Sequence, residues 1–133
     1  MVTKVFPAND EALQEALAFV EEELDNMNCS MKDVMRITVC VEEMFVNVAH
    51  YAYGGKEGTV EMTFDNEGRK MSITLVDDGV EFDPLAKDDP DITLTAEKRG
   101  IGGLGIFMVK KSMDEVIYER KNNKNYFTMK KEI

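Results

Sequence analysis

Residues 41–50 of the chain read VEEMFVNVAH, and the interpretation of the whole sequence starts from this stretch. It belongs to a longer run, residues 37–48, in which apolar residues recur every three or four positions, as they do on the buried face of a helix. Glu43 and Asn47 are four residues apart, so their side chains project next to each other, about 120° around the helix from the apolar stripe. A carboxylate can accept a proton, and an amide oxygen can bind a hard cation such as Mg²⁺. Together with His50, which falls on the same stripe, the pair suggests a face that does chemistry.

A glycine-rich segment, residues 99–105 with the sequence RGIGGLG, leads into a further expected helix. Free backbone N–H groups and the helix dipole favour a polyphosphate at such a helix start. Gly102, Gly103 and Gly105 remove side chains that would block it, and Arg99 is able to pair with a terminal phosphate. The segment is not a P-loop, because no Lys-Ser/Thr follows, and it lacks the strand–turn–helix context of a dinucleotide-binding fingerprint. On its own it is a weak signal for phosphate binding.

Between these two segments, Asp77-Asp78-Gly79 follows an apolar strand. A carboxylate at the end of a strand can accept a hydrogen bond from an exocyclic amino group such as that of adenine. Gly79 allows the backbone to turn and to approach a planar ligand closely. Taken alone, Asp-x-Gly after a strand more often marks an ordinary turn.

The hydrophobic periodicity predicts an α+β fold, a two-layer sandwich with a mixed, mostly antiparallel sheet and about three helices on one face. Asn9 or Asp10 is expected to cap the first helix and Ser30 the second, which ends near Gly54. The chain is expected to form a single domain over residues 1–133, in which the weakly periodic residues 77–100 are typical of a functional loop. The expected strands are residues 2–6, 59–64, 71–76, 115–120 and 126–131, and the expected helices start near residues 10, 30 and 104.

Composition limits the functions that the chain can have. A formal net charge of −10 over 133 residues argues against direct binding of nucleic acid or of an anionic membrane. The acidic runs at residues 21–23 and 83–91 are either solvated surface or a surface for a basic partner. Cys29 and Cys40 do not form a metal motif, and two reduced thiols are expected. No signal peptide and no apolar run of membrane-spanning length is visible, so a cytoplasmic location is expected.

Taken together and in this order, the three segments resemble the ATP-binding Bergerat fold of the GHKL superfamily, shared by gyrase, Hsp90-type chaperones, histidine kinases and MutL proteins. Residues 41–50 look like the N box of this fold, Asp77-x-Gly79 like its first glycine box, and Gly103-Leu104-Gly105 like its second. The finer resemblance is to bacterial anti-sigma factors that are also serine/threonine-protein kinases. The compact length, His50 and Tyr53, residues 82–84 (FDP) and residues 113–116 (MDEV) support that branch.

The resemblance implies ATP and Mg²⁺ as cofactors and assigns roles to individual residues. Asn47 would coordinate the magnesium ion, and Glu43 would be the general base for a substrate hydroxyl. Asp77 would bind the adenine amino group, and Gly79 would line the base pocket. The phosphate loop and the ATP lid, residues 83 to about 101, would include Arg99, Gly102, Gly103, Leu104 and Gly105. His50 is left with two roles, a ligand contact or a structural hydrogen bond, and Glu42 is expected to lie outside the site.

The resemblance further implies that the chain phosphorylates a STAS-domain anti-anti-sigma factor and binds a sigma factor, as a homodimer that meets through its first strand and helix. Two other functions remain open: an ATP-dependent binding module without efficient phosphoryl transfer, and the detached catalytic domain of a histidine kinase. The sequence also departs from the family. Its last strand has Lys124-Asn125-Tyr126 where a glycine–threonine pair usually lies near the adenine, with Thr128 close by.

Overall fold

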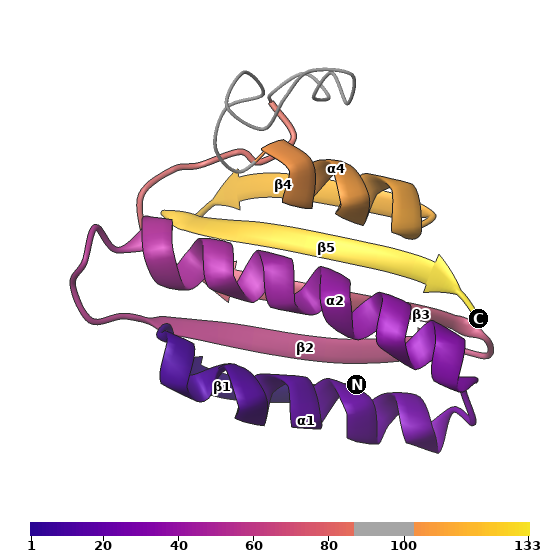
Figure 1. The fold of residues 1–133 in the computed structure, drawn as a ribbon. Coiled ribbons are helices and arrows are strands. Elements are labelled where there is room, and N and C mark those ends of the chain that lie inside the picture. The colour runs from indigo at the N-terminus through magenta and orange to yellow at the C-terminus, as the bar shows by residue number, and fades with distance from the viewer. Residues whose placement is uncertain (87–102) are drawn as a thin grey trace.

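The structure is a computed structural model that describes residues 1–86 and 103–133, residues 103 and 104 by their backbone alone. A single sheet and one layer of helices make up these ranges (Figure 1). The strands are β1 (Val2–Pro7), β2 (Thr59–Glu67), β3 (Lys70–Asp77), β4 (Glu115–Lys121) and β5 (Lys124–Glu132). The helices are the 3₁₀ turn η1 (Asp10–Ala12), α1 (Leu13–Asn26), α2 (Met31–Asn47), the π-helical turn η2 (Val48–Ala52) and α4 (Gly103–Ser112).

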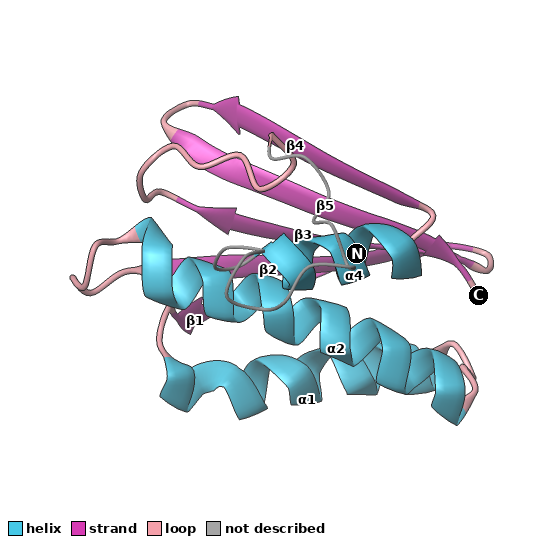
Figure 2. Ribbon diagram, turned by 45° about the horizontal axis from the view of Figure 1, so that its top comes forward, coloured by secondary structure: helices cyan, strands magenta, loops and turns pink. Residues whose placement is uncertain are grey.

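The sheet has the strand order β1-β2-β3-β5-β4. All of these neighbouring pairs are antiparallel, so the described sheet is purely antiparallel rather than mixed. Helices α1, α2 and α4 cover one face, with α2 in the middle (Figures 1 and 2). The predicted α+β sandwich is therefore confirmed. Its C-terminal strand, β5, lies between β3 and β4, and this arrangement brings the start of β5 beside the end of β3.

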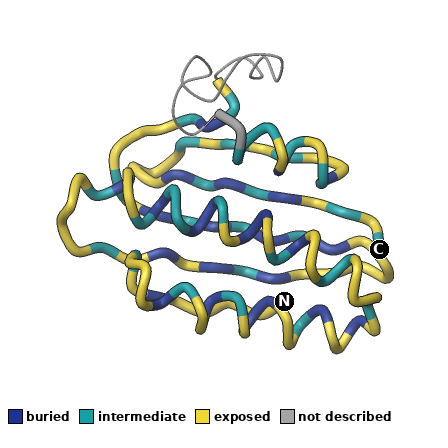
Figure 3. The backbone as a smooth tube through the Cα atoms, viewed as in Figure 1, coloured by how far each residue is buried: buried dark blue, intermediate teal, exposed yellow. Residues whose placement is uncertain are grey.

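The core lies between the sheet and the helices, and every second residue of each central strand points into it (Figure 3). The stripe that the sequence predicts on the second helix is buried, as are the methionines predicted to fill the core. Such alternation is what a sheet with one covered face requires. The buried stripe consists of Ile37, Val41, Met44 and Val48, and the methionines are Met27, Met44, Met62, Met71 and Met113.

The helix caps and the hairpin turns are formed by residues that are close together in the sequence. Asn9 Oδ1 accepts a hydrogen bond from Ala12 N at 2.9 Å, and Ser30 caps α2 through Asp33 N at 3.2 Å. Both hairpins are tighter than predicted, because the strands continue up to two-residue turns. Asn122 and Asn123 have φ angles of 54° and 60°, the left-handed pair that a type I′ turn needs.

One helix differs from the sequence-based prediction. The expected second helix runs unbroken to the glycines at 54 and 55, but the α-helical part ends at Asn47 and a π-helical turn occupies residues 48–52. Such turns insert an extra residue into a helix and often lie at functional sites. Residues after Asn47, among them His50, therefore point in other directions than an ideal helix predicts.

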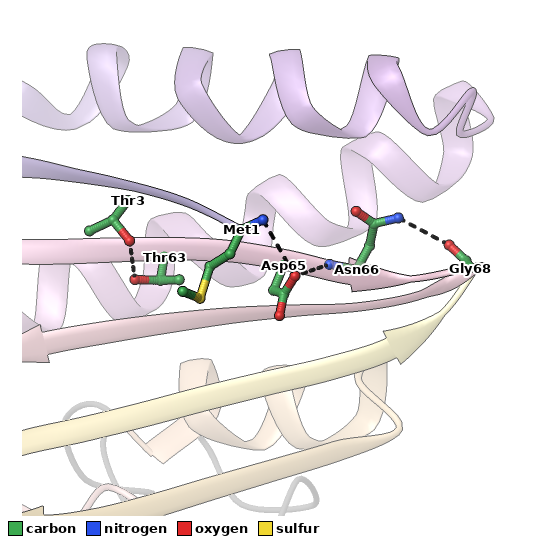
Figure 4. A network of polar contacts seen from close by, with 6 residues as sticks. All are labelled: Met1, Thr3, Thr63, Asp65, Asn66 and Gly68. Carbon is green, nitrogen blue, oxygen red and sulfur yellow. Dashed lines mark hydrogen bonds and ion pairs between the residues drawn. The ribbon is translucent and has the colours of Figure 1, made fainter.

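The sheet face opposite the helices carries a row of threonines. Thr3 Oγ1 lies 2.9 Å from Thr63 Oγ1, and Thr74 Oγ1 lies 3.0 Å from Thr128 Oγ1. Near the β2–β3 turn, the N-terminal amine lies 3.7 Å from Asp65, whose carboxylate also accepts the Asn66 N–H (Figure 4). Thr128 thus bonds to β3 on the face away from the helices, and does not reach the site described below.

Candidate functional site

A narrow slot opens between the end of α2, the turn η2 and the strand ends of β3, β4 and β5. Its walls are mainly apolar, and the polar side chains of Asn47, Asp77 and Asn125 line it as well. The slot has a volume of about 30 Å³, enough for about two water molecules. A planar ring would enter only if an outer wall of the slot moved, and Phe82, which is 41% exposed, belongs to that wall. The main apolar contributors are Met44, Val48, Ala52, Phe82, Tyr118 and Phe127.

Asp77 is the buried acid of the slot, with only 7% of its surface exposed. Its Oδ1 atom accepts two hydrogen bonds, from Gly79 N at 3.0 Å and from Asn125 Nδ2 at 2.9 Å. In the part of the chain that the structure describes, no donor bonds to Oδ2. A buried carboxylate with one oxygen held and one unused is suited to accept a hydrogen bond from a ligand donor such as an amino group.

Asn125, at the start of β5, is 5% exposed and uses its whole hydrogen-bonding capacity. Its Nδ2 atom donates to Asp77 and to Val80 O at 2.8 Å. Its Oδ1 atom accepts from the Tyr118 hydroxyl at 2.6 Å and from Arg120 at 3.2 Å. In the sequence, residues 124–126 stand out only as a departure from the family. The usable signal was the mismatch itself, an asparagine where a nucleotide-contacting residue is expected.

Tyr118 and Arg120 extend this network from β4. Burial raises the pKa of the Tyr118 phenol, and the Glu81 carboxylate raises it further, so the hydroxyl keeps its proton and acts as a donor. Arg120 Nη1 also donates to Gly79 O at 2.9 Å. The loop after β3 is therefore tied to β4 and β5 as well as to Asp77.

Gly79 packs against the end of the helix. A Cβ atom at this position would lie 2.1 Å from the backbone oxygen of Ala52, a distance no real contact allows. The next residue, Val80, donates its N–H to the same oxygen at 2.8 Å. The absence of a side chain at Gly79 thus allows the loop after β3 to lie against η2. Within the described residues, Ala52 lines the slot and Gly79 does not.

Glu43 and Asn47 lie on the α2 face that the sequence predicts. Both are partly buried, whereas Glu42 is exposed, as expected. A Cβ atom added to Gly105 would lie 2.2 Å from Glu43 Oε2, so the carboxylate rests directly on the first turn of α4. Among the described residues, neither the Glu43 nor the Asn47 side chain has a hydrogen-bond partner. The fold thus joins the first predicted segment to the second glycine box, next to the N-terminal end of a helix.

His50 lies outside this group. Its Nε2 atom is 2.8 Å from Asp10 Oδ1, and its side chain is 48% exposed. It lines a shallow depression of about 870 Å³ between β1, η1 and residues 55–59, on a different side of η2 from the slot. Of the two roles left open by the sequence, the contact with Asp10 supports the structural one, and His50 does not line the slot to which Asn47 contributes.

Tyr53 supports the same region from outside the slot. Its hydroxyl has both Thr59 O and Asp78 Oδ1, the latter at 2.8 Å, as acceptors for its single proton, and it accepts the Asp78 N–H at 3.2 Å, so it ties the loop after η2 to the end of β3. Burial raises the pKa of this phenol, and the hydrogen bond to Asp78 adds to the shift. Tyr53 thus fixes the residue next to Asp77 without lining the slot.

Several predicted site residues cannot be placed. Arg99, Gly102 and nearly all of the predicted lid, residues 83 to about 101, fall outside the described residues, and for Leu104 only the backbone is described. Within the described ranges, no cluster of three or more His, Cys, Asp or Glu side chains is arranged to hold a metal ion. Cys29 and Cys40 are both free thiols. None of the helices in these ranges is long and apolar enough to cross a membrane.

The family follows from a comparison with known protein families. A model described as the histidine kinase-like ATPase domain matches residues 6–131, which is almost the whole chain. The chain therefore belongs to the histidine kinase-like ATPase domain family. This confirms the resemblance on which the sequence-based site rests, and it implies ATP as the ligand.

The named relatives of the chain are protein kinases. Serine/threonine-protein kinase BtrW of Bordetella bronchiseptica is 23% identical over 94 residues, which cover 70% of this chain and 66% of that protein. Serine-protein kinase RsbW of Listeria monocytogenes is 27% identical over 92 residues, which cover 65% of this chain and 59% of that protein. The match therefore spans less than two thirds of the length of these curated relatives.

Solved structures agree on the fold. The RsbU and RsbW domains of a Mycobacterium tuberculosis protein match with a TM-score of 0.61 at 14% identity, over 99% of this chain and 32% of theirs. A chain of the SiaB–SiaC complex from Pseudomonas aeruginosa matches with a TM-score of 0.61 at 17% identity, over 100% of this chain and 90% of that one. The catalytic domain of the histidine kinase ThkA has a TM-score of 0.55 at 18% identity, over 99% and 97% of the two chains.

Proposed function

We propose that this chain is an ATP-dependent serine/threonine-protein kinase that binds adenine in the slot at Asp77. The observation that carries the proposal is the buried Asp77 carboxylate, with one oxygen fixed and the other unused, at the end of an apolar slot. The walls suit a flat aromatic base, and the free oxygen suits its amino group. The family, an ATPase domain, supports the same ligand.

Glu43 and Asn47 would act at the other end of the nucleotide. When bound, ATP supplies the transferable phosphoryl group. Asn47 offers an amide oxygen to the Mg²⁺ that accompanies the phosphates, and it has no competing partner among the described residues. Glu43 accepts the proton of a serine or threonine hydroxyl, and its contact with Gly105 holds it beside the start of α4, where phosphates are favoured. Phosphoryl transfer depends mainly on such positioning and charge neutralisation.

For the substrate, we propose a STAS-domain anti-anti-sigma factor, with a sigma factor as a second partner and a homodimer as the working form in the cytoplasm. The support is the resemblance to anti-sigma factor kinases and the names of the relatives, BtrW and RsbW. The solved SiaB–SiaC complex is one in which a protein of this fold is found with a partner protein. Residues 1–133 would form one ATPase domain.

A second candidate is a binding module that changes its affinity for partners with ATP but transfers no phosphoryl group. It shares the slot and the ligand, so nucleotide binding does not distinguish it. Glu43 favours the kinase, because a pure switch needs no carboxylate against the start of α4.

The proposal is tested in two steps with the full chain. Isothermal calorimetry with ATP and Mg²⁺ is expected to give saturable binding that weakens when the metal is chelated. Phosphoryl transfer from labelled ATP is then measured to a STAS-domain protein encoded next to this chain. Binding with transfer supports the kinase, and binding without transfer to any such neighbour supports the switch. Absence of saturable heat would exclude both.

A further inference from the structure

We infer that Asn125, held by Tyr118 and Arg120, is a positioning group that gives this site its selectivity for a base with an exocyclic amino group. The inference rests on the proposed function, since it concerns how the same slot recognises its nucleotide. It is independent of phosphoryl transfer, because all of its residues lie at the Asp77 end.

The first step is that Asn125 has no capacity left for a ligand. A side-chain amide has two N–H donors and an oxygen that accepts two hydrogen bonds. All four places are taken, by Asp77 Oδ1, Val80 O, the Tyr118 hydroxyl and Arg120. Asn125 therefore acts on a bound base only through its neighbours, although it lines the slot.

The second step is that the network fixes which way the amide points. Tyr118 and Arg120 are both donors, because the arginine is always charged and the phenol keeps its proton. They require an acceptor, so the Asn125 oxygen faces them and its nitrogen faces Asp77. A flipped amide would place donors against donors and leave Asp77 Oδ1 facing an oxygen.

The third step is that Asn125 helps to orient the Asp77 carboxylate. Strand pairing sets Asp77 opposite Asn125, and Asn125 opposite Arg120, so the three side chains lie in one row across β3, β5 and β4. Two donors on Oδ1 hold the carboxylate in one rotation and leave Oδ2 as the acceptor. Without the Asn125 donor, the Gly79 N–H alone would hold the carboxylate, and the acceptor for an amino group would be less firmly fixed.

The fourth step is that the same network holds the slot wall. Asn125 bonds to Val80 O and Arg120 bonds to Gly79 O, at 2.8 and 2.9 Å. The loop that leads to Phe82 is therefore fixed to Asn125, which also bonds to Asp77, and to Arg120, which bonds to Asn125. Recognition of the amino group and placement of the wall are coupled through Asn125.

The test compares ATP with purine riboside triphosphate, which lacks only the exocyclic amino group. Calorimetry with Mg²⁺ is expected to show that the wild-type chain binds the analogue about tenfold or more weakly, the usual effect of losing a hydrogen bond to a charged group. Asn125→Leu, which keeps the side-chain shape, is expected to bring the two affinities within about threefold of each other, mostly by weakening ATP. Thr128→Val, on the same strand but on the opposite sheet face, is the matched control and keeps the wild-type ratio.

Tyr118→Phe provides a second, milder variant in case Asn125→Leu fails to fold. It keeps the ring in the slot and removes only the donor to Asn125 Oδ1. The ratio of its affinities for ATP and for the analogue is expected to lie between the ratios of the wild type and of Asn125→Leu. A ratio unchanged in both folded variants would overturn the inference and leave the proposed function standing. No binding of ATP by the wild-type chain would overturn the proposed function first.

Discussion

The two ends of the proposed nucleotide site are built in different ways. At the Asp77 end, three strands contribute side chains that satisfy one another, and Asn125 has every donor and acceptor in use. At the other end, Glu43 and Asn47 have no hydrogen-bond partner among the described residues, and Glu43 packs against Gly105 in the first turn of α4. We propose that the base-binding end holds its hydrogen-bond acceptor in place before a ligand arrives, whereas the transfer end keeps its polar groups for the metal, the phosphates and the substrate hydroxyl.

This difference predicts that substitutions at the two ends change different measurements. Changes at the transfer end are expected to alter rate or metal dependence with little effect on folding. Changes at the base end are expected to alter base selectivity and, since buried polar groups are involved, stability as well.

The largest effect is expected for Glu43→Gln. The variant keeps the size of the side chain and removes its ability to take a proton, so transfer is expected to fall by about 10²- to 10⁴-fold. Calorimetry is expected to give nearly the wild-type affinity for ATP and Mg²⁺. Glu42→Gln, one residue away and exposed, serves as the control and keeps the rate. A wild-type rate for Glu43→Gln would show that Glu43 is not the base.

Next in size is Asn47→Ala, which removes the proposed magnesium ligand. ATP affinity is expected to fall by about tenfold or more, and the difference between measurements with Mg²⁺ and with a chelator is expected to shrink. His50→Gln is the comparison, because His50 bonds to Asp10 and lies outside the slot. If His50→Gln weakened metal-dependent ATP binding as much as Asn47→Ala does, His50 would have a role in ligand binding besides its contact with Asp10.

Gly105→Ala tests the contact between the two segments. The added methyl group would meet Glu43 Oε2, the mobile end of a long side chain, so the carboxylate is expected to move while the fold persists. A small displacement of a catalytic group can cost up to about 10²-fold in rate, and about tenfold is expected here. Circular dichroism and the melting temperature should match the wild type. Met108→Ala, on an exposed position of the same helix, is the control. An unchanged transfer rate for Gly105→Ala would mean that this contact does not position Glu43.

The smallest effect concerns pH and Tyr53. Because the pKa of this phenol is raised in the folded state, the folded chain holds its proton to higher pH than the unfolded chain does. The stability that this raised pKa contributes is fully present below about pH 10, the usual pKa of a phenol. It is lost as the pH rises through the pKa of Tyr53 in the folded chain. The free energy of unfolding, measured by urea titration from pH 8 to 10.5, is therefore expected to fall with pH. Tyr53→Phe should make that fall shallower.

Tyr51→Phe is the control for this measurement, since its ring is half exposed. Tyr53→Phe is also expected to lower stability at pH 8 by about 0.5–1.5 kcal/mol, through loss of the hydrogen bonds to Asp78 and Thr59. If the free energy of unfolding depended on pH equally in the wild type and in Tyr53→Phe, the titration of Tyr53 would not contribute to stability.

Local sequence patterns were sufficient to predict the helices and strands and one half of the candidate site. The apolar stripe on α2, the caps at Asn9 and Ser30 and the buried methionines depend on spacing within one segment, and all are found as predicted. The placement of Glu43 and Asn47 side by side also follows from spacing alone. The contact of His50 with Asp10 does not follow from spacing, because residues 48–52 form a π-helical turn where the periodicity predicts a continued α-helix.

By itself, the sequence determined the fold class, the family and the face of α2 that carries Glu43 and Asn47, because short-range periodicity and motif order encode these features. Only the tertiary structure decided that Asn125, 48 residues from Asp77, donates a hydrogen bond to the Asp77 carboxylate. That contact exists because β5 lies between β3 and β4, and strand order and register depend on the packing of the whole sheet. The same reason brings Gly105 onto Glu43: the two residues meet through the packing of α4 beside α2, which no local pattern specifies.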